Sequence, residues 1–245
     1  MIKKILIILV AVLLLAYLVY AMFFMNPDEN KDLTCKNLRI EIIDTLDQHY
    51  LTENEIRNNL NQSGLLPVGK DLGKINLTAI EKKLRENPFI RQVGSYKTID
   101  GTVQIKIYPR VPLLHVFSTK GSYYIDTTGE KMPIPRNFAA YVPVASGFIE
   151  DEYAKKKLYE FAQFLQQDKF WNSQIKQIYV EPNGDVELTP TVGDHQIVMG
   201  KIEDYKENLD KLRIFYEKGL SKVGWNRYSV INLKYMNQVV CTKKE

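Results

Sequence analysis

The sequence predicts an α+β protein with a single N-terminal transmembrane helix, a small β-α-α-β-β domain and a β-rich domain with two amphipathic helices. Three observations lead to this prediction. Residues 5–25 carry no charge, residues 35–110 alternate between strand and helix periodicity, and the segments after Pro112 are mostly short and β-patterned.

The uncharged segment from Ile5 through Leu14 to Met25 predicts a membrane anchor. Fourteen of its 21 residues are Leu, Ile, Val or Phe. A helix of this length crosses a hydrocarbon core of about 30 Å, and this composition favours insertion.

The flanking charges predict the orientation of the anchor. Lys3 and Lys4 precede it and Asp28 follows, so the N-terminus is expected in the cytoplasm and the body outside. A cleaved secretory signal is the alternative, because Val19-Tyr20-Ala21 resembles a cleavage site. The apolar run continues past that site to Met25, which favours an uncleaved anchor.

Charge and cysteine content limit the remaining possibilities. Lys3 and Lys4 are the only charged residues before Asp28, so the rest of the chain has 31 Lys and Arg against 29 Asp and Glu. This balance argues against a nucleic-acid surface, which needs a basic face. Cys35 and Cys241 could form a disulfide in an oxidising compartment or remain free, and the sequence leaves both open.

The first domain begins with a strand and two helices. Alternating apolar residues predict a strand over Asn37–Ile43. Thr52-Glu53-Asn54-Glu55 has the capping-box pattern, so a helix is expected from there to about Gln62. A second helix starts at Asn76 or Thr78 and ends before Pro88.

Two further strands complete this domain. A strand is expected over Phe89–Thr98, followed by an Asp100-Gly101 turn and a strand in which Val103, Ile105 and Ile107 alternate with polar residues. The order is β-α-α-β-β. Pro109 and Pro112 then mark a domain boundary, because proline lacks the donor that a sheet needs.

The second domain is predicted as strands interrupted by two helices. The expected strands are a hairpin over 123–132, a short piece at 143–145, a meander over 175–180, 185–188 and 195–199, and a long last strand, Ser229–Val240. The expected amphipathic helices are Asp151–Gln167 and Lys201–Gly219.

No set of residues assembles a recognisable active site. Gly64 to Lys70 has phosphate-loop spacing, but Asp71 replaces the required Ser or Thr. Asp126 and Glu130 could form a glycosidase-like pair or lie on a solvated hairpin tip, and Asp194-His195 lacks a nucleophile motif. We therefore expect no enzyme, cofactor, metal site or small-molecule substrate.

Aromatic residues near the C-terminus provide a different signal. Trp225, Tyr228 and Tyr235 flank or occupy the last expected strand. A terminal strand is often a sheet edge that can accept a partner strand. A strand buried in mid-sheet fits the pattern equally well.

The order of these parts resembles the bacterial cell-division family FtsQ, called DivIB in some lineages. The resemblance runs from Met1 to about Val240 and is carried by four segments. These are residues 87–93 (NPFIRQV) with 105–112 (IKIYPRVP), 124–129 (YIDTTG), 142–147 (VPVASG) and 228–235 (YSVINLKY).

The resemblance implies a particular division of the chain. Residues 1–4 would be a cytoplasmic tail, 5–25 the transmembrane helix and 26–34 a juxtamembrane linker. Residues 35–110 would be a POTRA domain, 111–241 the FtsQ-like β-domain and 242–245 a C-terminal tail.

The resemblance also implies a non-enzymatic scaffold of the divisome. It would lie in the cytoplasmic (inner) membrane at the division septum, with the C-terminal part periplasmic, and would bind FtsB- and FtsL-type division proteins through its C-terminal edge strand. The implied partner-binding residues are Tyr228, Leu233, Lys234, Tyr235, Met236, Asn237, Gln238, Val239 and Val240, with Tyr235 at the family's binding tyrosine.

Two departures from the family pattern affect this transfer. Asn232 stands where well-known members have Asp, and Lys243 stands where some have an aromatic residue that contributes to FtsB binding.

Two other hypotheses stand beside the divisome scaffold. The second hypothesis is a POTRA-containing envelope-biogenesis or export factor that binds client strands, and the third is an anchored hydrolase.

Overall fold

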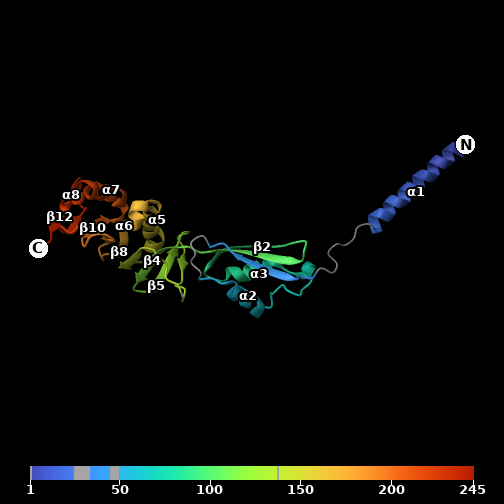
Figure 1. Ribbon diagram of the computed structural model, residues 1–245, viewed down its shortest axis with the longest axis horizontal. Coiled ribbons are helices and arrows are strands. Elements are labelled where there is room, and N and C mark those ends of the chain that lie inside the picture. Colours follow the sequence, from blue (N-terminus) through green and yellow to red (C-terminus); the bar gives the residue numbers. More distant parts are fainter. Residues whose placement is uncertain (1, 25–33, 45–49, 137) are drawn as a thin grey trace.

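The protein contains two β-sheets in two successive units, preceded by a separate N-terminal helix (Figure 1). The computed structural model describes residues 2–24, 34–44, 50–136 and 138–245. We refer to residues 34–110 as the N-terminal unit and to residues 111–245 as the C-terminal unit. This arrangement confirms the predicted mixed α+β class.

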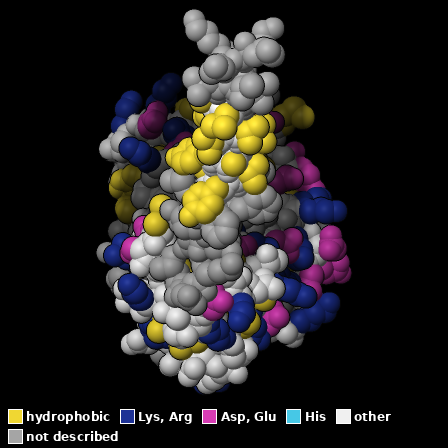
Figure 2. All heavy atoms as spheres, turned by 90° about the vertical axis from the view of Figure 1, so that its right-hand side faces the viewer, with side chains coloured by type: hydrophobic (Ala, Val, Ile, Leu, Met, Phe, Trp, Pro, Cys, Tyr) yellow, Lys and Arg dark blue, Asp and Glu magenta, His cyan; other side chains and the backbone are white. Residues whose placement is uncertain are grey.

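Helix α1, Ile2–Phe24, contains most of the expected anchor. Its described side chains from Leu9 to Tyr20 are exposed, Leu14 with 57% of its surface, and they form the hydrophobic column in Figure 2. Across the described residues, no helix combines the length and apolarity needed to cross a membrane. The side chain of Ile5, the whole of Met25 and residues 26–33 of the expected linker lie outside the described residues.

The N-terminal unit has the predicted β-α-α-β-β order. Its elements are β1 (Asn37–Ile42), α2 (Glu53–Gln62), the short 3₁₀ helix η1 (Leu72–Lys74), α3 (Leu77–Arg85), β2 (Ile90–Lys97) and β3 (Thr102–Pro109). Thr52 and Glu55 form the expected capping box at the start of α2. Of the two proposed starts of α3, the structure selects Asn76, whose side chain accepts from Ala79 N at 3.0 Å.

The sheet of this unit has the order β1-β3-β2, with β1 parallel and β2 antiparallel to β3. Ile56 and Leu60 of α2 and Ile80 and Leu84 of α3 are buried in one core with the inward residues of the strands. Each such side chain contributes about 1.5–3 kcal/mol by leaving water.

The C-terminal unit is built on a nine-stranded mixed sheet of order β12-β11-β10-β9-β8-β7-β4-β5-β6. Its strands are β4 (Pro112–Ser118), β5 (Gly121–Asp126), β6 (Lys131–Met132), β7 (Val144–Gly147), β8 (Ile175–Val180), β9 (Asp185–Pro190), β10 (Gln196–Lys201), β11 (Tyr228–Asn232) and β12 (Val240–Lys243). The predicted β5–β6 hairpin and β8–β9–β10 meander are both present, whereas β4 was not predicted.

The two expected helices of this unit are present, with interruptions. The first consists of α4 (Asp151–Tyr153), the π-helical stretch η2 (Ala154–Leu158) and α5 (Tyr159–Gln167). The second consists of η3 (Ile202–Asp204), α7 (Tyr205–Phe215), the π-helical stretch η4 (Tyr216–Leu220) and α8 (Ser221–Val223). An additional helix, α6 (Lys169–Gln174), is capped by Asp168, which accepts from Phe170 N at 2.9 Å.

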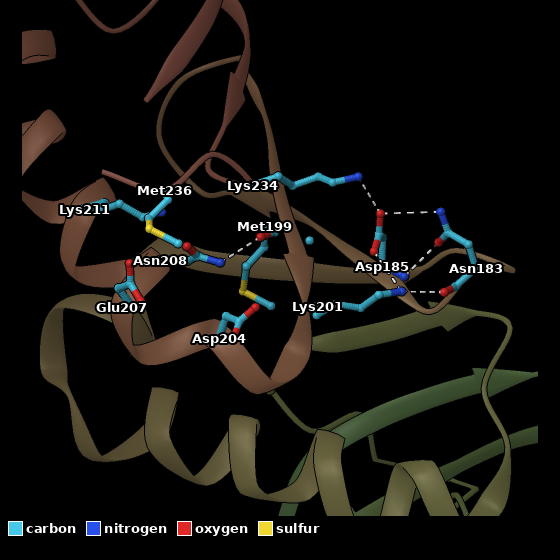
Figure 3. A pocket seen from close by; sticks show the side chains of 11 residues that line it. Asn183, Asp185, Met199, Lys201, Asp204, Glu207, Asn208, Lys211, Lys234 and Met236 are labelled. Atoms are coloured by element: carbon cyan, nitrogen blue, oxygen red, sulfur yellow. Dashed lines mark hydrogen bonds and ion pairs between the residues drawn. The ribbon is translucent and has the colours of Figure 1, made fainter. Parts of the chain in front are cut away.

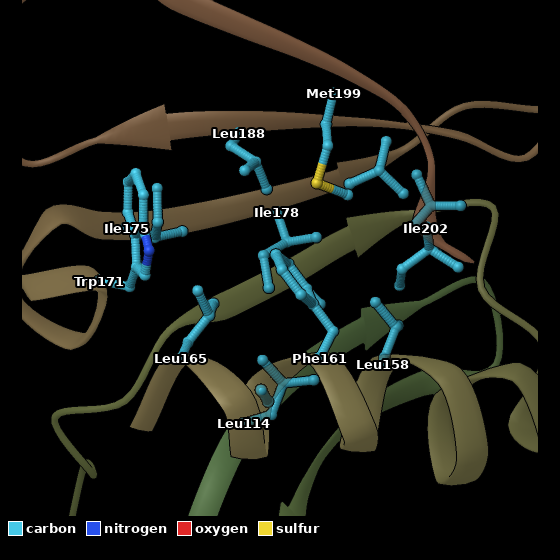
Figure 4. Packing of buried hydrophobic residues seen from close by; sticks show 14 of the residues in the cluster. Leu114, Leu158, Phe161, Leu165, Trp171, Ile175, Ile178, Leu188, Met199 and Ile202 are labelled. Atoms are coloured by element: carbon cyan, nitrogen blue, oxygen red, sulfur yellow. The ribbon is translucent and has the colours of Figure 1, made fainter. Parts of the chain in front are cut away.

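The core of the C-terminal unit packs both of these helices against the sheet, and Figure 4 shows the part at the first helix. Leu158, Phe161 and Leu165 point from the helix toward Leu114 of β4 and Ile178 of β8, and all five are fully buried. This packing fixes the sheet on which the last two strands are built.

The two units meet at a junction around Arg110. Its guanidinium contacts the buried Asp126 carboxylate at 2.9 Å, and its backbone oxygen accepts a hydrogen bond from the Tyr50 hydroxyl. The Tyr50 ring also lies 5.8 Å from Phe89 and 5.3 Å from Phe138, centroid to centroid. Side chains from both units therefore enclose the connection.

Candidate partner-binding edge

Strand β12 forms one edge of the nine-stranded sheet. It pairs antiparallel with β11 from Tyr228↔Lys243 to Asn232↔Val240. Within the described parts of the chain, no strand pairs with its other side. Strand β11 in turn joins the sheet by three parallel residue pairs to β10.

The predicted long strand Ser229–Val240 is wrong, because the chain leaves the sheet after Asn232 and returns as β12. Asn232 ends β11 by accepting a hydrogen bond from Lys234 N at 3.0 Å, an Asx turn that competes with strand pairing. Asn237 has a φ of +58°, in the left-handed region that Asn tolerates better than most residues. A continuous ladder cannot pass through either position.

This correction redistributes the predicted binding residues. Tyr228 lies in β11 and Val240 begins β12, while the others occupy the connecting segment 233–239, which we call the β11–β12 loop. The edge strand itself also contains Cys241, Thr242 and Lys243, which the sequence pattern did not assign to the site. The two asparagines were the available signal for the interruption.

The β11–β12 loop is fixed by contacts with the rest of the C-terminal unit. Leu233 is fully buried, and its N–H donates to Val198 O at 2.9 Å. Lys211 of α7 donates from its ammonium to the backbone oxygens of Leu233 at 2.8 Å and Tyr235 at 3.1 Å. One cation thus satisfies two carbonyl groups of a segment that has no ladder of its own.

Lys234 provides a second attachment (Figure 3). Its ammonium lies 2.7 Å from Asp185, which also contacts Lys201 at 3.1 Å, and these hydrogen bonds lower the pKa of the Asp185 carboxyl. The stem of Lys234 crosses Gly200, where φ is +86° and an added Cβ would come within 2.8 Å of Lys234 Cγ. Gly200 therefore allows the loop to approach β10.

The loop presents apolar side chains to solvent. Tyr235 is 53% exposed and Met236 81%, and the adjacent Val240 of β12 is 45% exposed. The other two aromatic residues near the C-terminus contribute to the core, since Trp225 packs 4.9 Å from Tyr216 and Tyr228 lies 5.9 Å from Phe215. Among Trp225, Tyr228 and Tyr235, the last alone has an exposed ring.

Two grooves flank the loop, and Lys211 lines both. The first, of about 500 Å³, is polar and includes Asp185, Asn208, Lys234 and Met236 (Figure 3). The second, of about 520 Å³, lies between the end of the loop and the α7–η4 helix and includes Ile214, Phe215 and Val239. The arrangement can accept an extended backbone along β12 and apolar side chains beside it.

The polar motifs of the sequence have structural roles. Asp126 accepts from Thr128 N at 2.8 Å and Glu130 N at 3.0 Å and pairs with Arg110, so it folds its own turn. Glu130 instead contacts Lys155 at 3.3 Å. The two carboxylates are therefore engaged separately and do not form a catalytic pair.

The remaining motifs are also accounted for by the fold. His195 is buried and lies 2.7 Å from the Tyr216 hydroxyl, whereas Asp194 pairs with Lys244 at 3.0 Å, so the adjacent residues serve different contacts. Lys70 donates to Gly64 O at 2.5 Å within the loop that resembled a phosphate site.

Cys35 and Cys241 are free, one in each unit. Among the side chains that the structure describes, no three His, Cys, Asp or Glu residues gather as a metal site.

Fold and edge together define a two-unit α+β protein with a sheet edge and a fixed loop beside it. Comparison with family models gives the particular family. Residues 33–108 match a POTRA-like domain, and residues 111–242 match the family described as FtsQ/DivIB, C-terminal related. The chain belongs to the FtsQ/DivIB family.

A curated relative agrees with this assignment. The chain is 24% identical over 187 residues to the cell division protein FtsQ of Rhodothermus marinus, an alignment that covers 70% of this chain and 67% of that protein. The family places the chain in cell division, and it is a scaffold family that is not known for enzymatic activity.

Proposed function

We propose that this protein is a non-enzymatic, membrane-anchored scaffold of the bacterial divisome that binds an FtsB/FtsL-type complex. The observation that carries this proposal is the edge strand β12 beside a fixed loop with exposed Tyr235 and Met236. A partner strand would add to β12, and its side chains would contact the loop.

The backbone and the side chains would contribute differently. A sheet edge supplies hydrogen bonds to any extended chain, so it gives affinity without much discrimination. Tyr235 and Met236 supply the discrimination, because large apolar side chains concentrate binding energy when a partner excludes water from them. The loop is already ordered by Lys211 and Lys234, which reduces the entropy lost on binding.

The anchor belongs to the same proposal. Residues 5–25 would insert in the cytoplasmic membrane with the N-terminus inside, on the grounds of their length, composition and flanking lysines. The two β-sheet units would then lie outside the membrane at the septum. A fluorescent fusion should give a band at the division site, and uniform envelope staining would contradict the proposal.

Binding is tested with the periplasmic segment of the FtsB-type protein encoded in the same genome. Tyr235→Ala should weaken binding by about tenfold or more, as expected for an aromatic anchor in an interface. Tyr141→Ala is the matched control, because Tyr141 is 99% exposed in another part of the C-terminal unit. Hydrogen exchange at the β12 amides should slow in the complex.

Two results would contradict the site assignment. One is full affinity of the Tyr235→Ala variant, and the other is unchanged exchange at β12 in a complex that otherwise forms. Point variants are preferable to removal of residues 235–245, because Val239 and Cys241 pack against the core and their loss would also destabilise the fold.

The alternative function is a POTRA-containing factor that binds client strands. The edges of the N-terminal sheet do not favour it, because side chains already bond to some of their backbone groups. On β2, Ser95 N already donates to Glu81 Oε1 of α3 at 2.9 Å. On β1, Leu38 O accepts from the guanidinium of Arg57 at 3.2 Å. Side chains thus occupy backbone groups that a client strand would need.

A further inference from the structure

One end of the N-terminal sheet brings together three segments at the point where the chain enters this unit. Lys36 N donates to Gly101 O at 2.8 Å, which joins the start of β1 to the β2–β3 turn. Cys35 N donates to Lys70 O at 2.8 Å, and Thr34 pairs with Asp71, which joins it to the loop before η1. In Figure 1 this end of the sheet faces α1.

Apolar side chains stand at the tip of this end. Ile99 is 96% exposed in the turn between β2 and β3, and Val68 of the neighbouring loop is 42% exposed. Tight turns are usually formed by small or polar residues, so an isoleucine with almost its whole surface in water has no role in the packing of this turn.

Four exposed lysines surround these apolar residues. They are Lys36, Lys70, Lys74 and Lys97. Lys70 and Lys97 donate to the backbone oxygens of Gly64 and Leu72, and no described carboxylate lies against either ammonium.

The nearby carboxylates are engaged within their own turns. Asp100 accepts from the hydroxyls of Thr98 and Thr102, the latter at 3.0 Å, and these bonds lower its pKa. Asp71 accepts from Gly73 N at 2.8 Å and lies 3.8 Å from Lys74. Among the residues that the structure describes, four lysines against two carboxylates leave this end positive.

We infer that this end of the N-terminal unit rests on the outer surface of the membrane, with Ile99 in the headgroup region and the lysines against anionic lipids. An apolar tip surrounded by lysines fits that surface, because the side chain enters the interface while the cations meet lipid phosphates. The segment from Phe24 to Thr34 spans at most about 35 Å, so an anchored α1 keeps this end near the bilayer.

The inference rests on the proposed anchor, and one experiment separates the two. The full chain carrying Cys241→Ser and Ile99→Cys is labelled with a polarity-sensitive fluorophore and reconstituted into vesicles of phosphatidylcholine and phosphatidylglycerol. Cys35 is buried and does not compete for the label. Spin-labelled lipids should quench the label at position 99 strongly and a matched label at Tyr141→Cys little, although both positions are almost fully exposed.

The contribution of charge is tested in the same preparation. Lys36→Gln with Lys74→Gln should lower the ratio of lipid-bound to free N-terminal unit by about fivefold for each lysine, whereas Lys218→Gln with Lys222→Gln should leave it unchanged. Vesicles of phosphatidylcholine alone should reproduce the effect of removing the lysines.

The outcomes distinguish the two claims. If the chain stays with the vesicles but position 99 is quenched no more than position 141, the membrane contact is refuted and the anchor stands. If the chain is not recovered with the vesicles, both fail. Quenching at position 99 that is the same in all lysine variants would refute the role of anionic lipid.

Discussion

Single buried polar residues join parts of the molecule that are distant in sequence. Asp126 is an example, because only 1% of its side chain is exposed while it contacts Arg110 and folds the turn to Glu130. His195 is another, because it lies against the Tyr216 hydroxyl beneath α7 and η4. Substitution of either should have effects that substitution of its exposed neighbours does not.

Replacing Asp126 by Ala should lower the free energy of unfolding by about 3 kcal/mol, because it leaves the Arg110 guanidinium and the turn amides without their acceptor. Glu130→Ala, at the exposed end of the same turn, should change it by no more than about 0.5 kcal/mol. Urea unfolding of the two variants measures the difference. Equal losses would mean that the buried pair has no special role.

Burial lowers the pKa of His195, so the folded state keeps the ring neutral where the unfolded chain binds a proton. Stability should therefore be unaffected by His195 above about pH 6.5 and should fall below it, by up to about 1.4 kcal/mol per pH unit until the folded-state pKa is reached. His195→Gln should flatten this slope in denaturant titrations between neutral and mildly acidic pH. An unchanged slope would show that the ring takes up its proton at the same pH in the folded and unfolded states.

At the scale of elements, the β11–β12 loop shows how a segment without a ladder is kept in place. Lys211 satisfies two of its carbonyl groups, Leu233 inserts in the core, and Gly200 makes room for the Lys234 stem. The loop is thus part of the folded C-terminal unit.

Lys211→Met keeps the apolar stem of this side chain but removes its charge and donors. We expect faster hydrogen exchange over residues 233–236 and about tenfold weaker binding of the FtsB-type segment, because the loop must then be ordered on binding. Lys222→Met is the control at the end of the same helical segment, since Lys222 lines neither groove and makes no hydrogen bond or ion pair with any described residue. Lys211→Arg should restore most of the affinity, and failure of both readouts to change would contradict this role.

The elements that local chemistry determines were predictable from sequence. The capping box at Thr52 fixed the start of α2, and simple alternation predicted β1 and β3. The last strand was predicted wrongly, because the run of β-favouring residues outweighed the two asparagines that interrupt it.

The candidate site was predictable only in part. Tyr235 was singled out through the family resemblance, whereas β12 after Val240 was missed because a four-residue edge strand ending in polar residues has little hydrophobic signal. Lys211 was not predicted as a contact of the loop, since its two acceptors are more than 20 positions away in sequence.

At the scale of the whole molecule, the junction around Arg110 determines how the two units are connected. The Tyr50 ring packs at a tilt between Phe89 of the N-terminal unit and Phe138 of the C-terminal unit, and its hydroxyl donates to the Arg110 backbone oxygen. A connection enclosed in this way should restrict rotation of one unit against the other.

Tyr50→Ala should loosen this junction, because it removes both ring contacts and the hydrogen bond. Small-angle X-ray scattering should then show a broader distribution of shapes than for the unaltered protein, with the secondary structure retained in circular dichroism. Tyr141→Ala, which removes an exposed ring outside the junction, should leave the distribution unchanged. The same distribution for both variants would contradict the role of Tyr50 in holding the connection.

The length of β12 has a consequence for how long a complex lasts. Four residues offer few backbone hydrogen bonds to an added strand, far fewer than the long ladders that make fibrils almost permanent. Most of the affinity must then come from a few side chains such as Tyr235 and Met236, and differences in such contacts act mainly on the dissociation rate. In the complex proposed above, this would favour a bond that can be broken and formed again within one division cycle.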